Sequence, residues 1–244
     1  MSTYFRNVPY VPYRFGTSTD RTFHQNLTTY VDLIDQIKNR GAFYQSYEII
    51  DDDRPDNLSF QLYGTTNHYW TFFLLNDKLR EQGWPLTRSK LLEVVKQRKP
   101  NTVLTTRNDI SSRFLVGSVV TGQSSGATGT IIKRRVDLGQ IIVRGDQNFL
   151  STEDITTTED DTLLSLTLSG AVEEYNSIYR YEDADGNPTD IDINSAPGAE
   201  LFPVTYYDLY SRENDDLKSI VVLKPRVVSQ VFGEFQNAMR NRFA

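Results

Sequence analysis

The chain has 244 residues, a formal net charge of −6, 38% hydrophobic and 12% aromatic residues, and no cysteine. The acidic balance argues against a general nucleic-acid binder, which needs a basic surface to displace counterions from phosphates. Without cysteine there is no disulfide framework, thiolate metal site or cysteine nucleophile. The N-terminus has no apolar signal region and no run reaches about 18 apolar residues, so we expect no membrane partner and a cytosol-like compartment before any assembly.

Residues 1–22 contain spaced aromatic residues and two prolines, with little periodicity. Solvated tails are usually poor in aromatic residues. We therefore expect an extended arm that lies on a partner, with Tyr10 and Tyr13 among its contacts. The alternative is a disordered tail.

Residues 23–40 carry apolar side chains on one stripe and charged side chains on the other, which predicts an amphipathic helix. Gly41 is typical of a residue that ends such a helix. The apolar stripe consists of Leu27, Tyr30, Val31, Ile34 and Ile37.

Residues 43–50 have the pattern of a strand, and residues 54–76, RPDNLSFQLYGTTNHYWTFFLLN, follow it. Pro55 suits the first turn of a helix, where its missing N–H has no partner to lose. Gly64 is typical of a helix end. The stretch therefore predicts two short helices that fold back on each other at Gly64, next to the strand.

This stretch resembles the LysM-like module of contractile-tailed phage proteins, and in particular the baseplate wedge subunit that clamps neighbouring wedges in T4-type phages. The resemblance covers about residues 20–95. It is carried by Arg54, Pro55, Asp56, Leu58, Leu62, Tyr63, Gly64, Tyr69, Trp70, Leu74, Leu75, Asn76 and Asp77. It implies a virion tail protein that is assembled in the host cytoplasm, with six copies in each baseplate. It also implies contacts with other wedge subunits and with the sheath-initiating subunit.

Residues 88–99 have the pattern of a helix that Pro100 ends, and residues 101–114 have the polar composition of a linker. Residues 114–172 then alternate β-rich runs with glycine turns. Short strands at this spacing predict a small barrel or sandwich. The elements resemble those of SH3-like barrels found in phage tail proteins, which implies a barrel-like insertion.

The last part of the chain predicts a hairpin and a helix. Residues 204–210 and 217–223 have strand patterns on either side of an acidic segment, so we expect them to pair with each other. Pro225 then opens a helix with one apolar stripe. That stripe consists of Val227, Val228, Val231, Phe232, Phe235 and Met239.

Catalytic and metal-binding patterns are weak throughout the chain. His24 and His68 are its only histidines, and no nucleophile or metalloprotease motif accompanies them. Residues 122–130 lack the lysine of a phosphate loop, which favours a glycine turn. Residues 183–187 start like a calcium loop but have no glutamate at its last position, which favours a hairpin turn. The three aspartates at residues 51–53 could form a metal or sugar site, but their position favours a solvated segment that complements the positive N-terminus of the following helix. We therefore predict no catalytic residue, no metal and no cofactor.

The aromatic cluster beside Gly64 allows three interpretations. It can be the core of a small domain, a protein contact, or the shallow glycan groove that LysM modules of the family use. We expect Trp70, Phe73 and Leu74 in the core and some tyrosines at a partner. The predicted protein-contact residues are Tyr10, Tyr13, Arg54, Pro55, Tyr63, Tyr69, Trp70 and Asn76.

The sequence thus predicts an α+β fold. Its parts are an arm over residues 1–22, a LysM-like helix and strand module over 23–100, an SH3-like β insertion over 114–172, and a hairpin with a C-terminal helix over 173–244. The favoured function is a non-enzymatic, structural subunit of a phage baseplate that clamps adjacent wedges. The alternative is a glycan-binding module that engages peptidoglycan.

Overall fold

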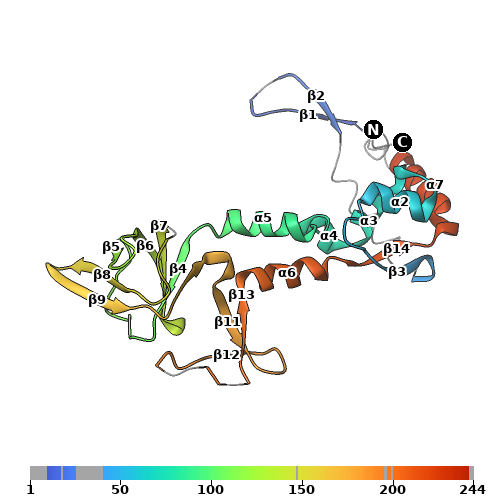
Figure 1. The fold of residues 1–244 in the computed structure, drawn as a ribbon. Coiled ribbons are helices and arrows are strands. Elements are labelled where there is room, and N and C mark those ends of the chain that lie inside the picture. Colours follow the sequence, from blue (N-terminus) through green and yellow to red (C-terminus); the bar gives the residue numbers. More distant parts are fainter. Residues whose placement is uncertain are drawn as a thin grey trace. The chain divides into compact units, whose positions relative to one another are not determined.

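A computed structural model describes residues 10–17, 19–25, 41–146, 148–194, 197–198 and 200–241. It confirms the α+β class, with helices and strands interspersed along the chain (Figure 1). The chain divides into two compact units. Unit 1 comprises residues 1–87 and 214–244, and unit 2 comprises residues 88–213. Unit 1 is therefore completed only when the chain returns from unit 2.

Unit 1 begins with a two-stranded hairpin. Strand β1 (Tyr10–Tyr13) pairs antiparallel with β2 (Thr22–Gln25), and Tyr13 lies opposite Thr22. The prediction of a helix from residue 23 is wrong at its start, because residues 23–25 belong to β2. The rest of that predicted helix, residues 26–40, lies outside the described residues, as do residues 1–9 of the predicted arm.

The remainder of unit 1 packs helices on a small sheet. The sheet pairs β3 (Tyr44–Glu48) antiparallel with β14 (Ser219–Leu223), which joins the two ends of the sequence. The other elements are η3 (Gly41–Phe43), α2 (Pro55–Tyr63), η4 (Thr66–His68), α3 (Trp70–Leu75), α4 (Asp77–Gln82) and α7 (Pro225–Asn241). The buried core residues are Ile49, Leu58, Phe72, Leu79, Leu217, Ile220, Val222, Leu223, Val228 and Val231. The predicted strand, helix pair and C-terminal helix are confirmed.

The predicted hairpin between residues 204–210 and 217–223 is wrong. Only its first residues are extended, in β13 (Phe202–Thr205), and α6 (Tyr206–Asp216) follows directly. The Thr205 hydroxyl accepts from the Asp208 N–H at 3.1 Å, and the Asp208 carboxylate accepts from the Thr205 N–H at 2.9 Å. This reciprocal cap starts a helix. The tyrosine alternation that resembled a strand is therefore helical.

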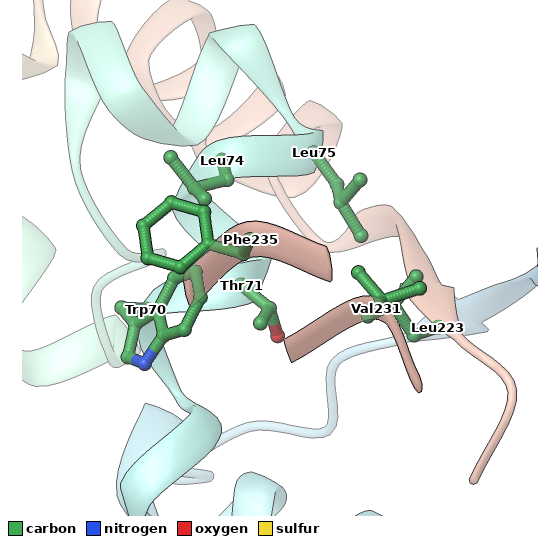
Figure 2. Close-up of a pocket in the computed structure, with 7 residues that line it drawn as sticks. All are labelled: Trp70, Thr71, Leu74, Leu75, Leu223, Val231 and Phe235. Carbon is green, nitrogen blue, oxygen red and sulfur yellow. The ribbon is translucent and has the colours of Figure 1, made fainter. Parts of the chain in front are cut away.

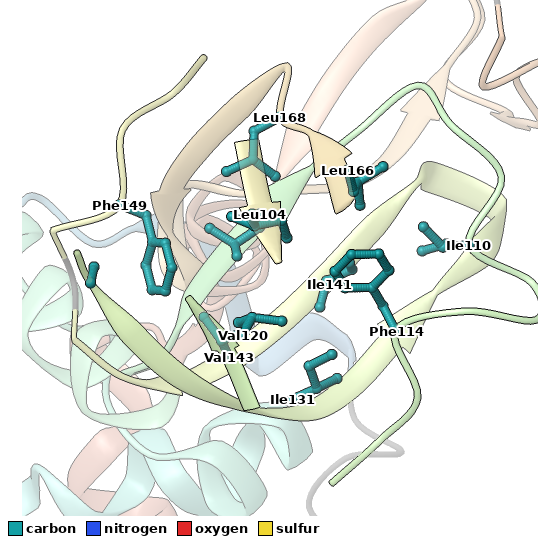
Figure 3. Packing of buried hydrophobic residues seen from close by; sticks show 12 residues of the cluster. Leu104, Ile110, Phe114, Val120, Ile131, Ile141, Val143, Phe149, Leu166 and Leu168 are labelled. Atoms are coloured by element: carbon teal, nitrogen blue, oxygen red, sulfur yellow. The ribbon is translucent and has the colours of Figure 1, made fainter. Parts of the chain in front are cut away.

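Unit 2 is built on a curled antiparallel sheet with the order β10-β4-β7-β6-β5-β8-β9. Its strands are β4 (Thr102–Thr105), β5 (Val119–Gly122), β6 (Thr128–Arg135), β7 (Gln140–Gly145), β8 (Asp154–Glu159), β9 (Thr162–Thr167) and β10 (Gly170–Glu173). The Leu168 N–H donates to Glu153 beside β8, and the Ser169 N–H donates to Thr105 in β4. The two residues between β9 and β10 are therefore hydrogen-bonded to the β8 side and to β4. The sheet wraps around one apolar core (Figure 3).

The prediction that residues 101–114 form a linker is wrong. The segment begins with β4, which lies between β7 and β10 with Val103 and Leu104 fully buried. Ile110 and Phe114 then fill the core that the sheet encloses (Figure 3). The sequence analysis missed this strand because the segment is mostly polar and a strand of four residues has little periodicity.

Unit 2 also contains α5 (Arg88–Arg98), η5 (Val136–Leu138), η6 (Glu174–Asn176), β11 (Ile178–Glu182) and β12 (Pro188–Thr189). Strand β11 pairs with both β12 and β13. Gly186 has a φ of 82° and donates to the Asp183 carbonyl, which confirms the predicted hairpin turn. Gly126 has a φ of 69° in the predicted glycine turn between β5 and β6. Among the described residues, no helix is long and apolar enough to cross a membrane.

Candidate functional site

The corner between α2 and α3 is set by local sequence signals. Pro55 occupies the start of α2, and Gly64 ends it in the left-handed region with a φ of 71°. The Gly64 N–H donates to the Phe60 carbonyl, which satisfies one of the last free carbonyls of the helix. The buried Ser59 hydroxyl donates to the Thr65 carbonyl at 2.7 Å. The chain therefore reverses in a fixed geometry.

Trp70 lies in the core of this corner. Its side chain is only 7% exposed, and its ring centroid lies 4.9 Å from that of Phe235 and 6.0 Å from that of Phe232 on α7. The prediction that Trp70 contacts a partner is therefore wrong, and its expected core position is correct. Leu74 is buried as expected, and Phe73 is half-buried. A small domain uses most of its apolar side chains for its own core.

Tyr63 and Tyr69, two further predicted contact residues, are half-buried. The Tyr63 ring stacks on Phe72 at 5.9 Å, and burial raises the pKa of its hydroxyl to about 12. Tyr63 therefore stays neutral at physiological pH and serves mainly as a packing residue. Burial also lowers the pKa of the nearby His68, so this imidazole is less easily charged than an exposed one.

A small apolar pocket of about 20 Å³ lies between α3, β14 and α7 (Figure 2). Its lining residues are Trp70, Thr71, Leu74, Leu75, Leu223, Val231 and Phe235. The stick view shows mainly apolar side chains around it. The Thr71 hydroxyl donates to the His68 carbonyl at 2.7 Å. The pocket is about the size that holds one water molecule, and it offers no set of polar groups that would orient a sugar.

Asn76 connects α3 to the sheet. Its side-chain amide donates to the Val221 carbonyl at 2.9 Å and to the Phe72 carbonyl at 2.8 Å. Its side-chain oxygen accepts from the Val221 N–H at 2.8 Å. The side chain therefore satisfies the edge of β14 as a neighbouring strand would. Asn76 is half-buried and its polar atoms are used inside the chain, so its predicted contact with a partner stays a prediction.

Replacing Asn76 with alanine is expected to lower the free energy of unfolding of unit 1 by about 1–2 kcal/mol, because both backbone groups of Val221 lose their partner. The only two tryptophans, Trp70 and Trp84, lie in unit 1. Urea unfolding followed by tryptophan fluorescence therefore reports this unit. The control is Asn57→Ala on the exposed side of α2, which should change stability by less than about 0.5 kcal/mol. Equal effects of the two variants would contradict the assigned role.

The start of α2 is charged and solvated. Arg54 is exposed and pairs with Asp56 through two contacts of 3.1 and 3.2 Å, and Pro55 is half-buried. Asp51 lies in the turn before α2. Lys218, just before β14, forms ion pairs with Asp51 at 2.8 Å and with Asp215 at 2.7 Å. These carboxylates, with Asp215 the larger influence, raise the pKa of Lys218. Asp51 thus helps to tie this turn to the segment before β14.

The β1–β2 hairpin exposes most of its aromatic surface. Tyr10, Tyr13, Phe15 and Phe23 are 64%, 55%, 57% and 69% exposed. The Phe15 ring lies edge-on to Tyr13 at 5.0 Å and to His24 at 5.1 Å. Tyr10 and Tyr13 were predicted as contact residues, whereas Phe23 was missed because it was assigned to a helix. Spaced aromatics on both sides of Gly16 were the available signal for a hairpin.

No metal centre is apparent in the parts of the chain that the structure describes, since no group of three or more histidine or acidic side chains converges there. His24 and His68 lie on different elements, β2 and η4. The prominent features of the site are therefore apolar and aromatic surfaces, which suit protein contact.

Residues 14–91 match the model of a family described as base plate wedge protein 53. This segment belongs to the phage baseplate wedge family. The match places the chain, called the wedge subunit below, in the virion tail. The family implies a structural role in the baseplate and interaction with other baseplate proteins. No curated protein matches its sequence.

The matched segment of the wedge subunit begins after β1, includes β2 and the α2–α3 corner, and ends in the first turn of α5. It confirms the resemblance of residues 54–76 to a baseplate wedge subunit. It leaves β14, α7 and most of unit 2 outside the match. The structural character of the family favours a role without catalysis.

Proposed function

We propose that the wedge subunit clamps adjacent wedges of the baseplate through protein–protein contacts of unit 1. The observation that carries this proposal is the exposed aromatic surface of the β1–β2 hairpin. The matched segment, residues 14–91, includes Phe15 and Phe23 of this surface.

The exposed aromatic side chains of this hairpin favour binding to a partner. An isolated two-stranded hairpin is at best marginally stable in water, because it has no second layer to cover its apolar side chains. Aromatic side chains each carry about 150–250 Å² of surface and dominate the energetics of interfaces. Tyrosine and phenylalanine are enriched in interface cores, whereas lysine and glutamate are depleted there. Docking of the hairpin on a neighbour would cover this surface.

The partners that we propose are other wedge subunits and the sheath-initiating subunit, with six copies of the chain in each baseplate. This part of the proposal follows from the family resemblance. A closed ring repeats each contact at every position. Contacts of modest affinity then reinforce one another, because binding at one site raises the effective concentration at the next.

The combined substitution of Tyr13→Ser and Phe23→Ser tests the clamp. Incorporation of the variant into baseplates should fall by at least about tenfold, because the loss of each buried aromatic side chain at an interface costs about 1–3 kcal/mol. Tryptophan fluorescence should show an unchanged fold of unit 1. Incorporation is measured by quantitative mass spectrometry of purified tails from cells that express only the variant.

The matched control is Phe202→Ser in unit 2, since Phe202 is also an exposed aromatic residue. This variant should be incorporated like the wild-type chain. Normal incorporation of the double variant would contradict the proposed clamp. Sedimentation of the isolated subunit with insoluble peptidoglycan, abolished by the same double substitution, would instead support a glycan-binding module.

A further inference from the structure

The C-terminal helix α7 contacts the α2–α3 corner through a histidine. The His68 ring in η4 lies 5.0 Å from the Phe232 ring on α7 and 6.2 Å from the Tyr63 ring on α2. The Thr71 hydroxyl donates to the His68 carbonyl at 2.7 Å, which fixes the backbone at this residue. The imidazole is therefore held against aromatic rings of two helices.

One nitrogen of this ring is buried without a partner. The Nδ1 atom of His68 has no hydrogen-bond partner in the part of the chain that the structure describes. A neutral imidazole can carry its single proton on Nε2, whereas the imidazolium cation must carry a proton on Nδ1 as well. The cation would therefore bury a charged donor that has no acceptor. Burial of such a group costs more than burial of the neutral ring.

The described groups that face His68 supply no compensating charge. Phe232 of α7 is apolar, and Tyr63 of α2 stays neutral because burial raises its pKa to about 12. From α3, the Thr71 hydroxyl is already bound to the His68 carbonyl. Glu234 of α7 is exposed and lies two residues after Phe232, which places it on nearly the opposite side of the helix. Burial lowers the pKa of His68, and no neighbouring charge opposes this effect.

We propose that His68 makes the docking of α7 sensitive to pH, because mild acid charges the imidazole and weakens the contact between α7 and the α2–α3 corner. A histidine whose pKa is lowered by docking stabilises the docked state fully above its ordinary pKa of 6.5. That contribution is lost as pH falls through the lowered pKa. Carboxyl groups of ordinary pKa titrate at lower pH, so the histidine responds first. The proposal does not depend on the clamp.

Loosening of α7 would uncover apolar side chains of the corner. Trp70 is 7% exposed, and its ring lies 4.9 Å from that of Phe235 on α7 (Figure 2). Val231 of α7 is buried in the same cluster as Leu223 of β14. At neutral pH the helix therefore covers an apolar surface, and the charge on His68 determines how firmly it does so.

Substitution of His68 by phenylalanine keeps an aromatic ring at this position and removes the group that titrates. The matched control is His24→Gln, because His24 is the other histidine of the chain and lies on β2. The opening constants of the α7 amides are measured by hydrogen exchange and mass spectrometry of the full-length wedge subunit. The two conditions are about pH 7.5 and about pH 5, with correction for the intrinsic pH dependence of exchange.

In the wild type and in His24→Gln, the opening constants of the α7 amides should rise at least about threefold at the lower pH. The rise should be absent in His68→Phe. The amides of β3 and β14 serve as an internal reference in the same unit and should not change. An NMR titration of the His68 ring in the wild type gives its pKa directly, which should lie below 6.5. This measurement keeps the test decisive even if His68→Phe fails to fold.

Four results would overturn the proposal. The first is a pKa of His68 at or above 6.5 in the wild type. The second is an unchanged opening constant of α7 in the wild type at the lower pH. The third is an equal rise in His68→Phe, which would assign the effect to other groups. The fourth is an equal rise for the amides of β3 and β14, which would show that acid unfolds the whole unit and does not release the helix.

Discussion

Replacement of Phe72 with alanine is expected to lower the free energy of unfolding of unit 1 by about 3–5 kcal/mol, because it leaves a cavity in a core that cannot fully collapse. Phe72 is fully buried, stacks on Tyr63 at 5.9 Å and contacts Trp84 at the same ring distance. The free energy of unfolding of a typical domain is only about 5–15 kcal/mol, so this substitution would remove a large part of the stability of unit 1. Urea unfolding followed by fluorescence of Trp70 and Trp84 measures it.

Phe60 provides a control of the same residue type in the same unit. It lies on α2 and is 60% exposed. Phe60→Ala should change the free energy of unfolding by less than about 0.5 kcal/mol, since exposed positions away from caps and cores tolerate substitution. If the two alanine variants had similar unfolding midpoints, the assigned core would be wrong. If Phe60→Ala instead reduced incorporation into tails without loss of stability, Phe60 would belong to a contact surface.

Replacement of Glu153 with glutamine is expected to destabilise unit 2 by about 2–4 kcal/mol, because buried donors then face an amide in place of a carboxylate. Glu153 is 4% exposed and accepts from the backbone N–H groups of Ser124, Ser125 and Leu150 at 2.7–3.0 Å, and from the Ser125 hydroxyl at 2.8 Å. A Cβ atom at Gly122 would lie 2.6 Å from its oxygens, so a glycine is required there. Hydrogen exchange of the β5, β6 and β8 amides measures the loss.

The same carboxylate predicts a pH dependence of unit 2. Burial raises the pKa of Glu153, but the four hydrogen bonds together outweigh burial and hold its pKa below the ordinary value of 4.5. A carboxyl group whose pKa is lower in the folded state stabilises that state above its unfolded pKa, and the contribution disappears as pH falls through the folded pKa. The difference in stability between wild type and Glu153→Gln should therefore be constant at neutral pH and shrink below about pH 4. A constant difference down to pH 2 would contradict this assignment.

The local elements of unit 1 followed from strong sequence signals. Pro55 marks the start of α2 because its ring fixes φ, and Gly64 marks the end because glycine adopts a positive φ at no steric cost. Both properties hold in any tertiary context. The apolar stripe after Pro225 likewise predicted α7 correctly. The wedge family could be recognised from the same residues, because the corner depends on them.

The missed elements depend on partners far away in the chain. Residues 102–105 form a strand in the sheet interior because β7 and β10 lie on both sides of them, and neither partner is near in sequence. Segment 217–223 pairs with β3 rather than with residues 204–210, because the cap of Thr205 and Asp208 begins a helix between them. That cap has a sequence signature, T-x-x-D, which outweighed the strand-like alternation.

The contact residues were the least predictable. Aromatic side chains have similar patterns in a core and at an interface, and only packing separates Trp70, which is buried by α7, from Tyr10 and Tyr13, which are exposed on the hairpin. Asn76 resembled a surface residue until Val221 was found to lie beside it. By itself the sequence determined the class of the fold, the helical corner and the wedge family, because these rest on backbone preferences of neighbouring residues. The tertiary structure decided which strands pair and which aromatic residues remain exposed, because each depends on contacts between residues that the sequence separates widely.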